Sequence, residues 1–353
     1  MTAPLNWTHI LGKLALGQDL DRAEALWSLD EIMAGQTPEG IVAAFMIALR
    51  HKGESVSEIS GLVDAMLANS LKLETGNDAV DIVGTGGDLI GTVNISSMAS
   101  ILTAASGIPV LKHGSRSASG KTGSSEMLEA LGIRLDLDAN QVAAVFKKTG
   151  ITFFFAPVFH PAMKFVAPVR KLLAVPTTFN FLGPLANPAQ PIATSLGVAN
   201  LEIAPLMAQE MASRGRSALV FRANDGLDEL STTGNSQIWQ VSGGEVTQFE
   251  LNPMKLGLAK ASTSALLGGD AAFNAQVARD LFAGKTVGNL AAVRDIVILN
   301  AAGGVLSYQM AKDPTHADVN LDLRFADAIH LVASALDSGA GEPKLNEWVA
   351  ATA

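Results

Sequence analysis

The chain has 353 residues, of which 48% are apolar and 17% charged, with a net charge of −9 and no cysteine. The absence of cysteine excludes disulfides and thiolate metal sites, and the negative charge disfavours general nucleic-acid binding. This length allows one large and one smaller domain, and the apolar content is typical of a well-buried α/β protein. The first residues lack the layout of a signal peptide and no apolar run is predicted to cross a bilayer, so we expect a cytoplasmic protein without membrane contact.

The N-terminal part of the chain predicts only helices. Apolar residues recur at helical spacing in residues 7–16, 20–33, 38–51 and 56–67. Thr37 is predicted as an N-cap with Pro38 at the first helical position, and Ser55 with Glu58 matches a capping box. These patterns predict a small helical domain over residues 1–75.

Strands and helices alternate after this region. Strand-like apolar runs lie at residues 79–83, 108–111, 151–155, 193–198 and 218–221. Helical patterns lie between or after them at residues 126–131, 141–148, 203–212 and 275–282. Such alternation indicates βαβ units and a mostly parallel sheet. Residues 237–241 and 246–249 predict a β-hairpin around Gly243 and Gly244.

Residues 161–187 interrupt the alternation with a helical pattern and a loop rich in proline and glycine. We expect residues 160–190 to return to the helical domain and to form a hinge. The α/β domain is then predicted over residues 76–159 and 191–353, and it carries the candidate phosphate-binding segments.

A glycine-rich turn follows the first predicted strand. Gly84, Gly86 and Gly87 precede Asp88, and Thr92, Asn94 and Ser96 open a helical pattern. Glycines let the backbone approach a phosphate, N–H groups at a helix start point at anions, and the polar side chains suit phosphate and ribose oxygens. The alternative is a turn that only tightens a strand–helix connection. The spacing matches neither a Walker loop nor a Rossmann fingerprint.

A second polar loop, residues 111–125, is predicted after the second strand. It carries Lys112, Arg116 and Lys121 among hydroxyls and glycines, as polyphosphate binding requires. Because parallel strands end at one edge of a sheet, we expect this loop beside the glycine-rich turn. The alternative is a solvated polar loop.

Two further segments carry candidate chemistry. Asp228 and Glu229 are adjacent carboxylates after the strand at 218–221, and they suit either Mg²⁺ or a solvated acidic turn. Residues 155–185 mix aromatic and apolar side chains with His160 and Arg170, which would suit a flat anion. By local chemistry alone, this segment is better explained by ordinary packing around a core histidine.

In this order, the motifs resemble those of the anthranilate phosphoribosyltransferase family. They are Gly-Thr-Gly-Gly-Asp at 84–88, Lys-His-Gly at 112–114, His-Pro-Ala-Met-Lys at 160–164 and Asp-Gly-Leu-Asp-Glu at 225–229. The likeness covers nearly the whole chain and includes residues 268–270 and 299–303. It implies an α/β fold like that of nucleoside phosphorylases and phosphoribosyltransferases, and commonly a homodimer through the helical domain.

The resemblance also implies a reaction and its residues. The phosphoribosyl group of phosphoribosyl pyrophosphate (PRPP) would pass to the amine of anthranilate, a step of tryptophan biosynthesis. The implied PRPP residues are Gly84, Thr85, Gly86, Gly87, Asp88, Thr92, Asn94, Ile95, Ser96, Ser97, Lys112, His113, Gly114, Ser119 and Gly120. The implied anthranilate residues are Gly84, His113, Ser115, His160, Arg170 and Gly183. Two Mg²⁺ ions would bind Ser96, Asp228 and Glu229, and the implied catalytic residues are His113, Arg170, Asp228 and Glu229.

The sequence departs from the family pattern at three places. Ser115 stands where asparagine is common, and Pro176 lies where an arginine is more usual. The third place is Arg222-Ala223-Asn224, which precedes Asp225 where a His-Gly pair is common. Two rivals remain open: a pyrimidine nucleoside phosphorylase of similar architecture, and a nucleic-acid-binding relative without activity. The acidic pair and the glycine-rich turn speak against the first rival, and the net negative charge speaks against the second.

Overall fold

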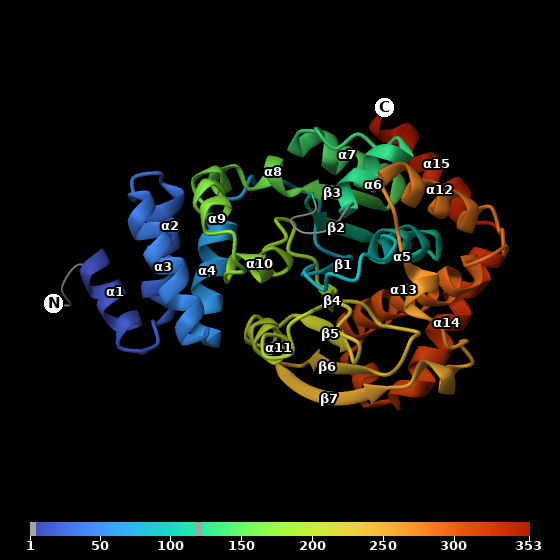
Figure 1. Ribbon diagram of the computed structural model, residues 1–353. Coiled ribbons are helices and arrows are strands. Elements are labelled where there is room, and N and C mark those ends of the chain that lie inside the picture. Colours follow the sequence, from blue (N-terminus) through green and yellow to red (C-terminus); the bar gives the residue numbers. More distant parts are fainter. Residues whose placement is uncertain (1–4, 117–121) are drawn as a thin grey trace. The chain divides into compact units, whose positions relative to one another are not determined.

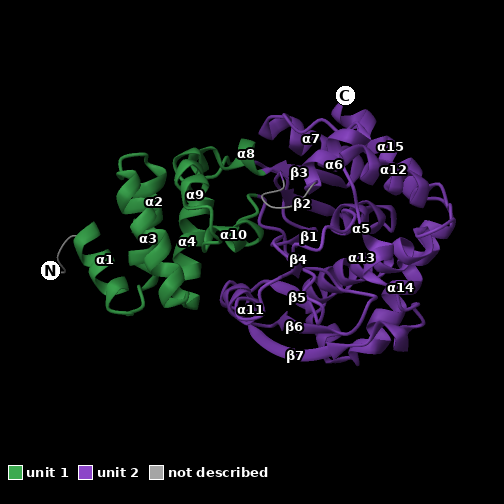
Figure 2. Ribbon diagram, in the orientation of Figure 1, with its two compact units in different colours: residues 1–72, 156–188 green, residues 73–155, 189–353 purple. Residues whose placement is uncertain are grey.

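The computed structural model describes residues 5–116 and 122–353 (Figure 1). The chain forms two compact units (Figure 2). Unit 1 comprises Met1–Lys72 and Ala156–Pro188, and unit 2 comprises Leu73–Phe155 and Ala189–Ala353. The predicted domain boundaries lie close to these limits.

Unit 1 is entirely helical in its described part. Its helices are α1 (Trp7–Ala15), α2 (Arg22–Met33), α3 (Glu39–Lys52), α4 (Val56–Ala68), α8 (Ala156–Phe159), η1 (Pro161–Phe165), α9 (Ala167–Leu173), α10 (Phe179–Leu182) and η2 (Gly183–Leu185). The predicted capping box at Ser55 and Glu58 is confirmed. The predicted N-cap at Thr37 is wrong, since α3 begins one residue later with Pro38 as its N-cap and without a side-chain cap. Proline has no side-chain acceptor, and the Thr37 hydroxyl is buried without a hydrogen-bond partner among the described residues.

Close helix packing organises unit 1. Helices α2 and α4 pack together, and a side chain at Gly61 would meet the Ala25 Cβ at 2.8 Å, so glycine permits this approach. Phe45, Leu29 and Leu62 are fully buried between the helices. Burial of such side chains contributes roughly 1.5–3 kcal/mol each.

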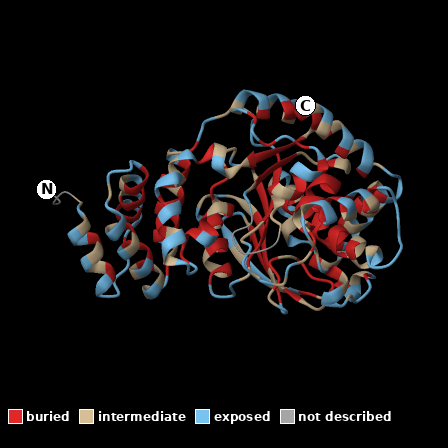
Figure 3. Cartoon of the chain, turned by 45° about the horizontal axis from the view of Figure 1, so that its top comes forward, coloured by how far each residue is buried: buried red, intermediate tan, exposed pale blue. Residues whose placement is uncertain are grey.

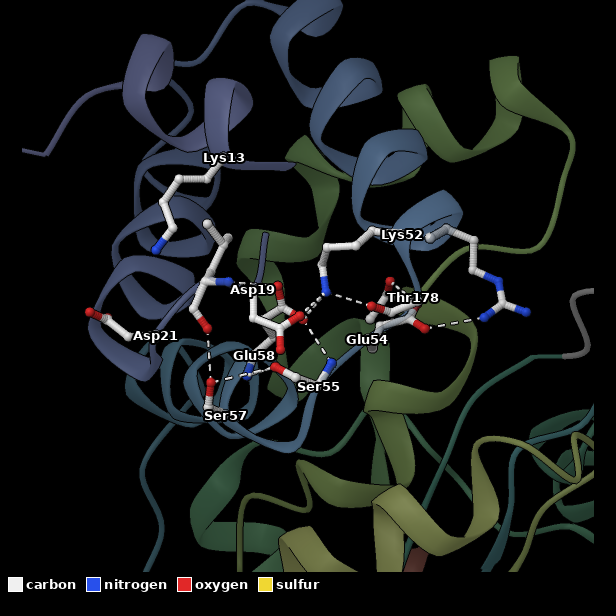
Figure 4. A network of polar contacts seen from close by, with 12 residues as sticks. Lys13, Asp19, Asp21, Lys52, Glu54, Ser55, Ser57, Glu58 and Thr178 are labelled. Atoms are coloured by element: carbon white, nitrogen blue, oxygen red, sulfur yellow. Dashed lines mark hydrogen bonds and ion pairs between the residues drawn. The ribbon is translucent and has the colours of Figure 1, made fainter. Parts of the chain in front are cut away.

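A polar network also joins the two chain segments of unit 1 (Figure 4). Lys52 donates to Asp19 at 2.6 Å and to Glu58 at 2.9 Å. Glu54, whose side chain is buried, accepts a hydrogen bond from Arg50 at 3.1 Å and another from the Thr178 hydroxyl at 2.5 Å. Because Thr178 lies in the returning segment 156–188, this last bond ties that segment to the N-terminal helices.

Unit 2 is built on one seven-stranded sheet in the order β3-β2-β1-β4-β5-β6-β7. Its strands are β1 (Val80–Gly84), β2 (Val110–Gly114), β3 (Ile151–Phe155), β4 (Ala193–Gly197), β5 (Ser217–Ala223), β6 (Ser236–Ser242) and β7 (Glu245–Leu251). The first five in this order are parallel, and β6 and β7 are antiparallel. The mostly parallel sheet and the hairpin at Gly243 and Gly244 are therefore confirmed.

Helices cover this sheet, whose strands are mostly buried (Figure 3). They are α5 (Ile95–Ala105), α6 (Ser124–Leu131), α7 (Ala139–Thr149), α11 (Ala204–Ser213), η3 (Pro253–Leu256), η4 (Thr263–Leu266), α12 (Ala271–Phe282), α13 (Leu290–Lys312), η5 (Pro314–Asp318), α14 (Leu321–Asp337) and α15 (Gly341–Thr352). Helix α13 packs on α5, β1, β4 and β5, while α11 packs on β5, β6 and β7.

Helix α13 corrects one sequence prediction. Its 23 residues are long and apolar enough to cross a membrane by length and composition, although no such run was predicted. However, 72% of its most apolar window is buried inside the protein. Its contacts with the sheet and with α5 identify it as the central core helix of unit 2.

Strand β2 begins two residues later than predicted. Pro109 precedes it and has no N–H to donate, so the ladder with β3 starts at Val110. The strand also ends three residues later than predicted, because its pairing with β3 continues to Gly114, so Lys112 and His113 lie inside the strand and not in the loop that follows it. This shift determines how both side chains are used at the candidate site.

Candidate active site

The candidate site lies where β1, β2 and β4 end. Gly84 of β1 is in register with Gly197 of β4, and Asp228 comes close to both. A Cβ on Gly84 would overlap the Asp228 carboxylate, and a Cβ on Gly197 would overlap the Asp228 backbone carbonyl. The two glycines therefore allow the acidic loop to approach the strand ends.

The glycine-rich turn wraps around this acidic loop. Gly86 and Gly87 have φ values of +67° and +85°, which favour glycine. The Gly86 N–H donates to Asp228 Oδ2 at 2.7 Å. Thr85 fixes the turn to the end of β4, because its N–H donates to the Gly197 carbonyl at 3.0 Å.

The start of α5 holds the second carboxylate. The Ser96 N–H donates to Glu229 Oε1 at 3.0 Å, and the Ser96 Oγ lies 3.5 Å from Lys112 Nζ. The structure therefore brings together the glycine-rich turn, Ser96, Lys112 and the acidic pair. This agrees with the expectation that loops after neighbouring parallel strands meet at one edge of the sheet. The solvated-turn alternative for Asp228 is wrong, since this residue is 8% exposed.

Burial dominates the electrostatics of the acidic pair. Burial, followed by the neighbouring charge of Asp88, raises the pKa of Asp228 to about 7. Burial and the Asp228 charge also raise the pKa of Glu229, while Lys112 opposes the shift. Two desolvated carboxylates with oxygen lone pairs to spare suit a hard cation such as Mg²⁺. Within residues 5–116 and 122–353, no three His, Asp or Glu side chains are arranged to hold a metal by themselves.

Lys112 and His113 are buried in β2. Lys112 donates to the Ile82 carbonyl at 2.5 Å, and burial lowers its pKa while Asp81 and Glu229 oppose this. The His113 N–H donates to Asp81 Oδ1 at 3.1 Å. Lys112 thus lies between two acidic groups and supports Ser96.

The second polar loop is described only at its two ends. Ser119 and Gly120 lie outside the described residues. Ser115 is exposed, and Arg116 makes a bidentate pair with Glu129 at 2.9 and 3.0 Å. Arg116 is therefore engaged with α6, whereas the sequence predicted a cation available to phosphate.

The remaining PRPP candidates surround the start of α5. Gly114 ends β2, where a Cβ would lie 2.6 Å from the Ser124 Oγ. Thr92 pairs with Leu267 in an isolated β-bridge. Ile95 and Ser97 are almost completely buried, so we expect them to reach a ligand only through the backbone.

Sequence reasoning missed a contribution from α12. Asn274 is 1% exposed and donates to Asn94 Oδ1 at 2.8 Å. It lies four residues beyond Asp270, the N-cap of α12, and follows the Gly268-Gly269 pair. A glycine pair before a capped helix was the available signal, but it did not indicate contact with the glycine-rich turn.

The other anthranilate candidates belong to unit 1. Burial lowers the pKa of His160 to about 4, while the backbone groups of Ala186 and Met66 oppose this shift. Arg170 lies on α9, where burial lowers the pKa of its guanidinium. Among the described residues, none forms a hydrogen bond or ion pair with that guanidinium. Gly183 begins η2, and a Cβ there would meet no atom within 4 Å.

Arg222, one of the departures from the family pattern, makes two hydrogen bonds to backbone carbonyls at the end of the sheet. Its Nε donates to the Ala199 carbonyl at 2.8 Å, and its Nη1 donates to the Ala223 carbonyl at 3.1 Å. These bonds connect the segment after β4 to the end of β5. A basic residue at this position therefore has a structural use within unit 2.

Comparison with known proteins identifies the relatives of this chain. Residues 76–342 match a family described as "Glycosyl transferase family, a/b domain", and residues 8–70 match its helical bundle domain. Anthranilate phosphoribosyltransferase of Leifsonia xyli is 50% identical over 352 residues, covering 100% of both chains. The crystal structure of the Thermus thermophilus enzyme of that name has a TM-score of 0.87 at 36% identity, covering 97% of this chain and 99% of the other.

A more distant structure has the same fold. Anthranilate phosphoribosyltransferase from Saccharomyces cerevisiae, in complex with PRPP and Mg, matches with a TM-score of 0.86 at 24% identity. That match covers 98% of this chain and 97% of the yeast chain. On the strength of the full-length likeness to the bacterial relatives, this chain belongs to the anthranilate phosphoribosyltransferase family.

Proposed function

We propose that this chain transfers the phosphoribosyl group of PRPP to the amine of anthranilate and releases pyrophosphate, a step of tryptophan biosynthesis. One observation carries the proposal for the site. The carboxylates of Asp228, which is buried, and of Glu229, which is partly buried, accept hydrogen bonds from the N–H groups of Gly86 and Ser96. A cation site is thereby joined to two backbone segments suited to phosphate.

PRPP is proposed to bind along the glycine-rich turn, the start of α5 and the second polar loop. The sequence positions are those implied by the family resemblance, Gly84 to Asp88, Thr92, Asn94 to Ser97, Lys112 to Gly114, Ser119 and Gly120. The described ones lie at or beside the carboxyl ends of β1 and β2, where parallel sheets bind ligands.

We further propose two Mg²⁺ ions at Ser96, Asp228 and Glu229. The donor set fits, because all three groups offer oxygen and the two carboxylates are desolvated. When bound, Mg²⁺ would offset negative charge on the pyrophosphate that leaves. Lys112 would balance the charge of Glu229 and hold Ser96 in place rather than extend into solvent.

The protein's own part in the reaction is mainly orientation. As the ribose C1 loses pyrophosphate, an oxocarbenium-like centre develops, and the amine must wait on its opposite face. Arg170 is proposed to meet the anthranilate carboxylate, since its desolvated guanidinium has no partner among the described residues. His113 is assigned to positioning of the amine. An aromatic amine is neutral near neutral pH, so its attack needs no strong general base.

The first test is the loss of anthranilate fluorescence when protein, anthranilate, PRPP and Mg²⁺ are mixed. We expect loss that EDTA prevents and that the double variant Asp228→Asn/Glu229→Gln abolishes. Asp136→Asn/Glu202→Gln is the matched control, because it removes two exposed carboxylates elsewhere in unit 2. Loss without Mg²⁺, or unchanged loss in the first variant, would refute the metal assignment. Phosphate-dependent release of a free base would instead indicate a nucleoside phosphorylase.

Two broader properties remain part of the proposal. We propose that the enzyme acts in the cytoplasm as a homodimer through its helical unit, as the family resemblance implies. Light scattering at several protein concentrations would test the dimer. A constant monomer mass would refute it.

A further inference from the structure

Four residues of unit 2 form a closed circuit of hydrogen bonds, here called the amide ring. The Gly269 N–H donates to Asn274 Oδ1 at 2.9 Å, and Asn274 Nδ2 donates to Asn94 Oδ1 at 2.8 Å. Asn94 Nδ2 then donates to the Thr122 carbonyl at 3.2 Å. The Thr122 hydroxyl closes the circuit by donating to the Gly269 carbonyl at 2.9 Å.

The backbone fixes the direction of every bond in the amide ring. The Gly269 N–H can only donate, so the acceptor oxygen of the Asn274 amide must face it. The nitrogen of Asn274 therefore faces Asn94, whose own oxygen must accept. At the far end, the Thr122 carbonyl can only accept, which agrees with the same orientation of Asn94. The orientation of both amide groups is thus fixed from each end of this series of hydrogen bonds, by the Gly269 N–H and by the Thr122 carbonyl.

The amide ring connects three segments that are far apart in sequence. Asn94 precedes α5 at the end of the glycine-rich turn, Thr122 closes the second polar loop, and Asn274 lies on α12. Parallel backbone bonds reinforce the connection, since the Val93 N–H donates to the Leu266 carbonyl at 2.9 Å. At Gly268, a Cβ would lie 2.7 Å from the Thr92 carbonyl and 2.8 Å from Asn274 Oδ1. The segment before α12 therefore packs directly against the turn.

We infer that Asn274 is a positioning residue for PRPP, acting through Asn94 and Thr122. The amide ring uses one N–H and one lone pair of the Asn94 side chain, which leaves the other N–H and lone pair for a ligand. Because Asn274 is almost completely buried, it acts by orienting Asn94 and not by touching the substrate. This inference rests on the proposed PRPP site, which includes Asn94.

The test is Asn274→Asp, which keeps the acceptor for Gly269 but removes the donor to Asn94. We expect the PRPP KM, and the PRPP Kd measured by calorimetry, to rise about 2- to 10-fold, the range that one hydrogen bond accounts for. The anthranilate KM at saturating PRPP should stay within about twofold. Asn320→Asp is the matched control, because Asn320 caps α14 by accepting a hydrogen bond that aspartate accepts equally well. Its constants should not change.

Two further variants keep the outcome decisive. Thr122→Val opens the amide ring without changing Asn274, and it should also raise the PRPP KM. It provides the test if Asn274→Asp does not fold.

Asn94→Ala tests the proposed site itself. If Asn94→Ala weakens PRPP binding but folded Asn274→Asp and Thr122→Val do not, the inference about Asn274 is overturned. If Asn94→Ala also leaves the PRPP Kd unchanged, the proposed site fails instead. Equal shifts for both substrates would indicate a purely structural role and would overturn the inference as well.

Discussion

Two carboxylates with similar burial behave in opposite ways in the two units. Glu24 of unit 1 is 6% exposed and Asp228 of unit 2 is 8% exposed. Burial alone would raise the pKa of Glu24, but hydrogen bonds from Lys13, the Asp21 N–H and His9 lower it to about 2. Burial is the main cause that raises the pKa of Asp228 to about 7, and the neighbouring carboxylate of Asp88 adds to the shift where Glu24 has positive partners.

The difference teaches how to separate a structural carboxylate from a functional one. Glu24 receives its positive partners from within its own unit, as do Glu54 and Glu58. Among residues 5–116 and 122–353, the acidic pair of unit 2 has mainly backbone donors and the cation Lys112. An acidic pair whose negative charge is only partly balanced by the protein's own positive groups is suited to bind an external cation.

The largest expected effect comes from removing that acidic pair. Asp228→Asn/Glu229→Gln should lower kcat roughly 10³-fold or more, because charge developing on the leaving group is no longer compensated. The metal-free variant should unfold at a temperature no lower than the parent, since the change removes repulsion between buried charges. Steady-state kinetics and thermal unfolding check both parts. A variant that loses stability but keeps its activity would show that Asp228 and Glu229 are structural carboxylates like Glu24.

The second prediction concerns the space that the acidic loop occupies. Gly197→Ala should displace the Asp228 backbone and lower kcat about 10²-fold, because misplacement by about 1 Å is costly in an active site. Gly12→Ala on α1 is the matched control, since a Cβ there meets no atom within 4 Å. That control should keep full activity and gain roughly 0.5–1 kcal/mol of stability. Equal kcat values in the two variants would contradict the close approach.

The third prediction tests the structural carboxylate. Glu24→Gln should lower the free energy of unfolding by about 1–3 kcal/mol at neutral pH and leave kcat unchanged. Since the pKa of Glu24 is lowered on folding, its stabilising contribution is present above its unfolded value of 4.5 and is lost as pH falls towards about 2. Urea unfolding of parent and variant should therefore converge in acid. Glu31→Gln on the same helix is the control, and a difference that persists in acid would contradict the assignment.

The smallest effect is expected at Ser115. The exposed Ser115→Asn variant restores the residue common in the family and should lower the anthranilate KM about 2- to 10-fold through one added hydrogen bond. The PRPP KM should not change. Ser57→Asn on α4 is a matched exposed-serine control for general effects of the substitution. An unchanged or higher anthranilate KM would mean that Ser115 does not limit capture of this substrate.

The sequence predicted the elements of the fold better than their ends. Apolar periodicity located every strand, yet β2 was displaced because Pro109 and the polar Lys112 and His113 obscured its true limits. The buried environment of Lys112 depends on Asp81 and Glu229, which come from other segments. Local sequence patterns do not show which distant residues balance the charge of a buried side chain.

The same limit applies to the candidate site. Glycine spacing and the Asp228-Glu229 pair were visible as motifs, because their chemistry is local. Asn274 was not, since its role depends on a contact with Asn94 across 180 positions of sequence. Likewise, Thr37 matched the sequence signal of an N-cap, but in the structure its hydroxyl is buried and does not cap α3.

The bond between Glu54 and Thr178 has a consequence for any attempt to divide the protein. The chain crosses between its units three times, after residues 72, 155 and 188. A fragment starting at residue 73 would retain Thr178 but lose Glu54, the acceptor of its hydroxyl. Neither half of a simple cut is therefore a complete unit. The smaller unit can be made independently only by splicing its two segments together, and proteolysis between them should release no autonomous helical domain.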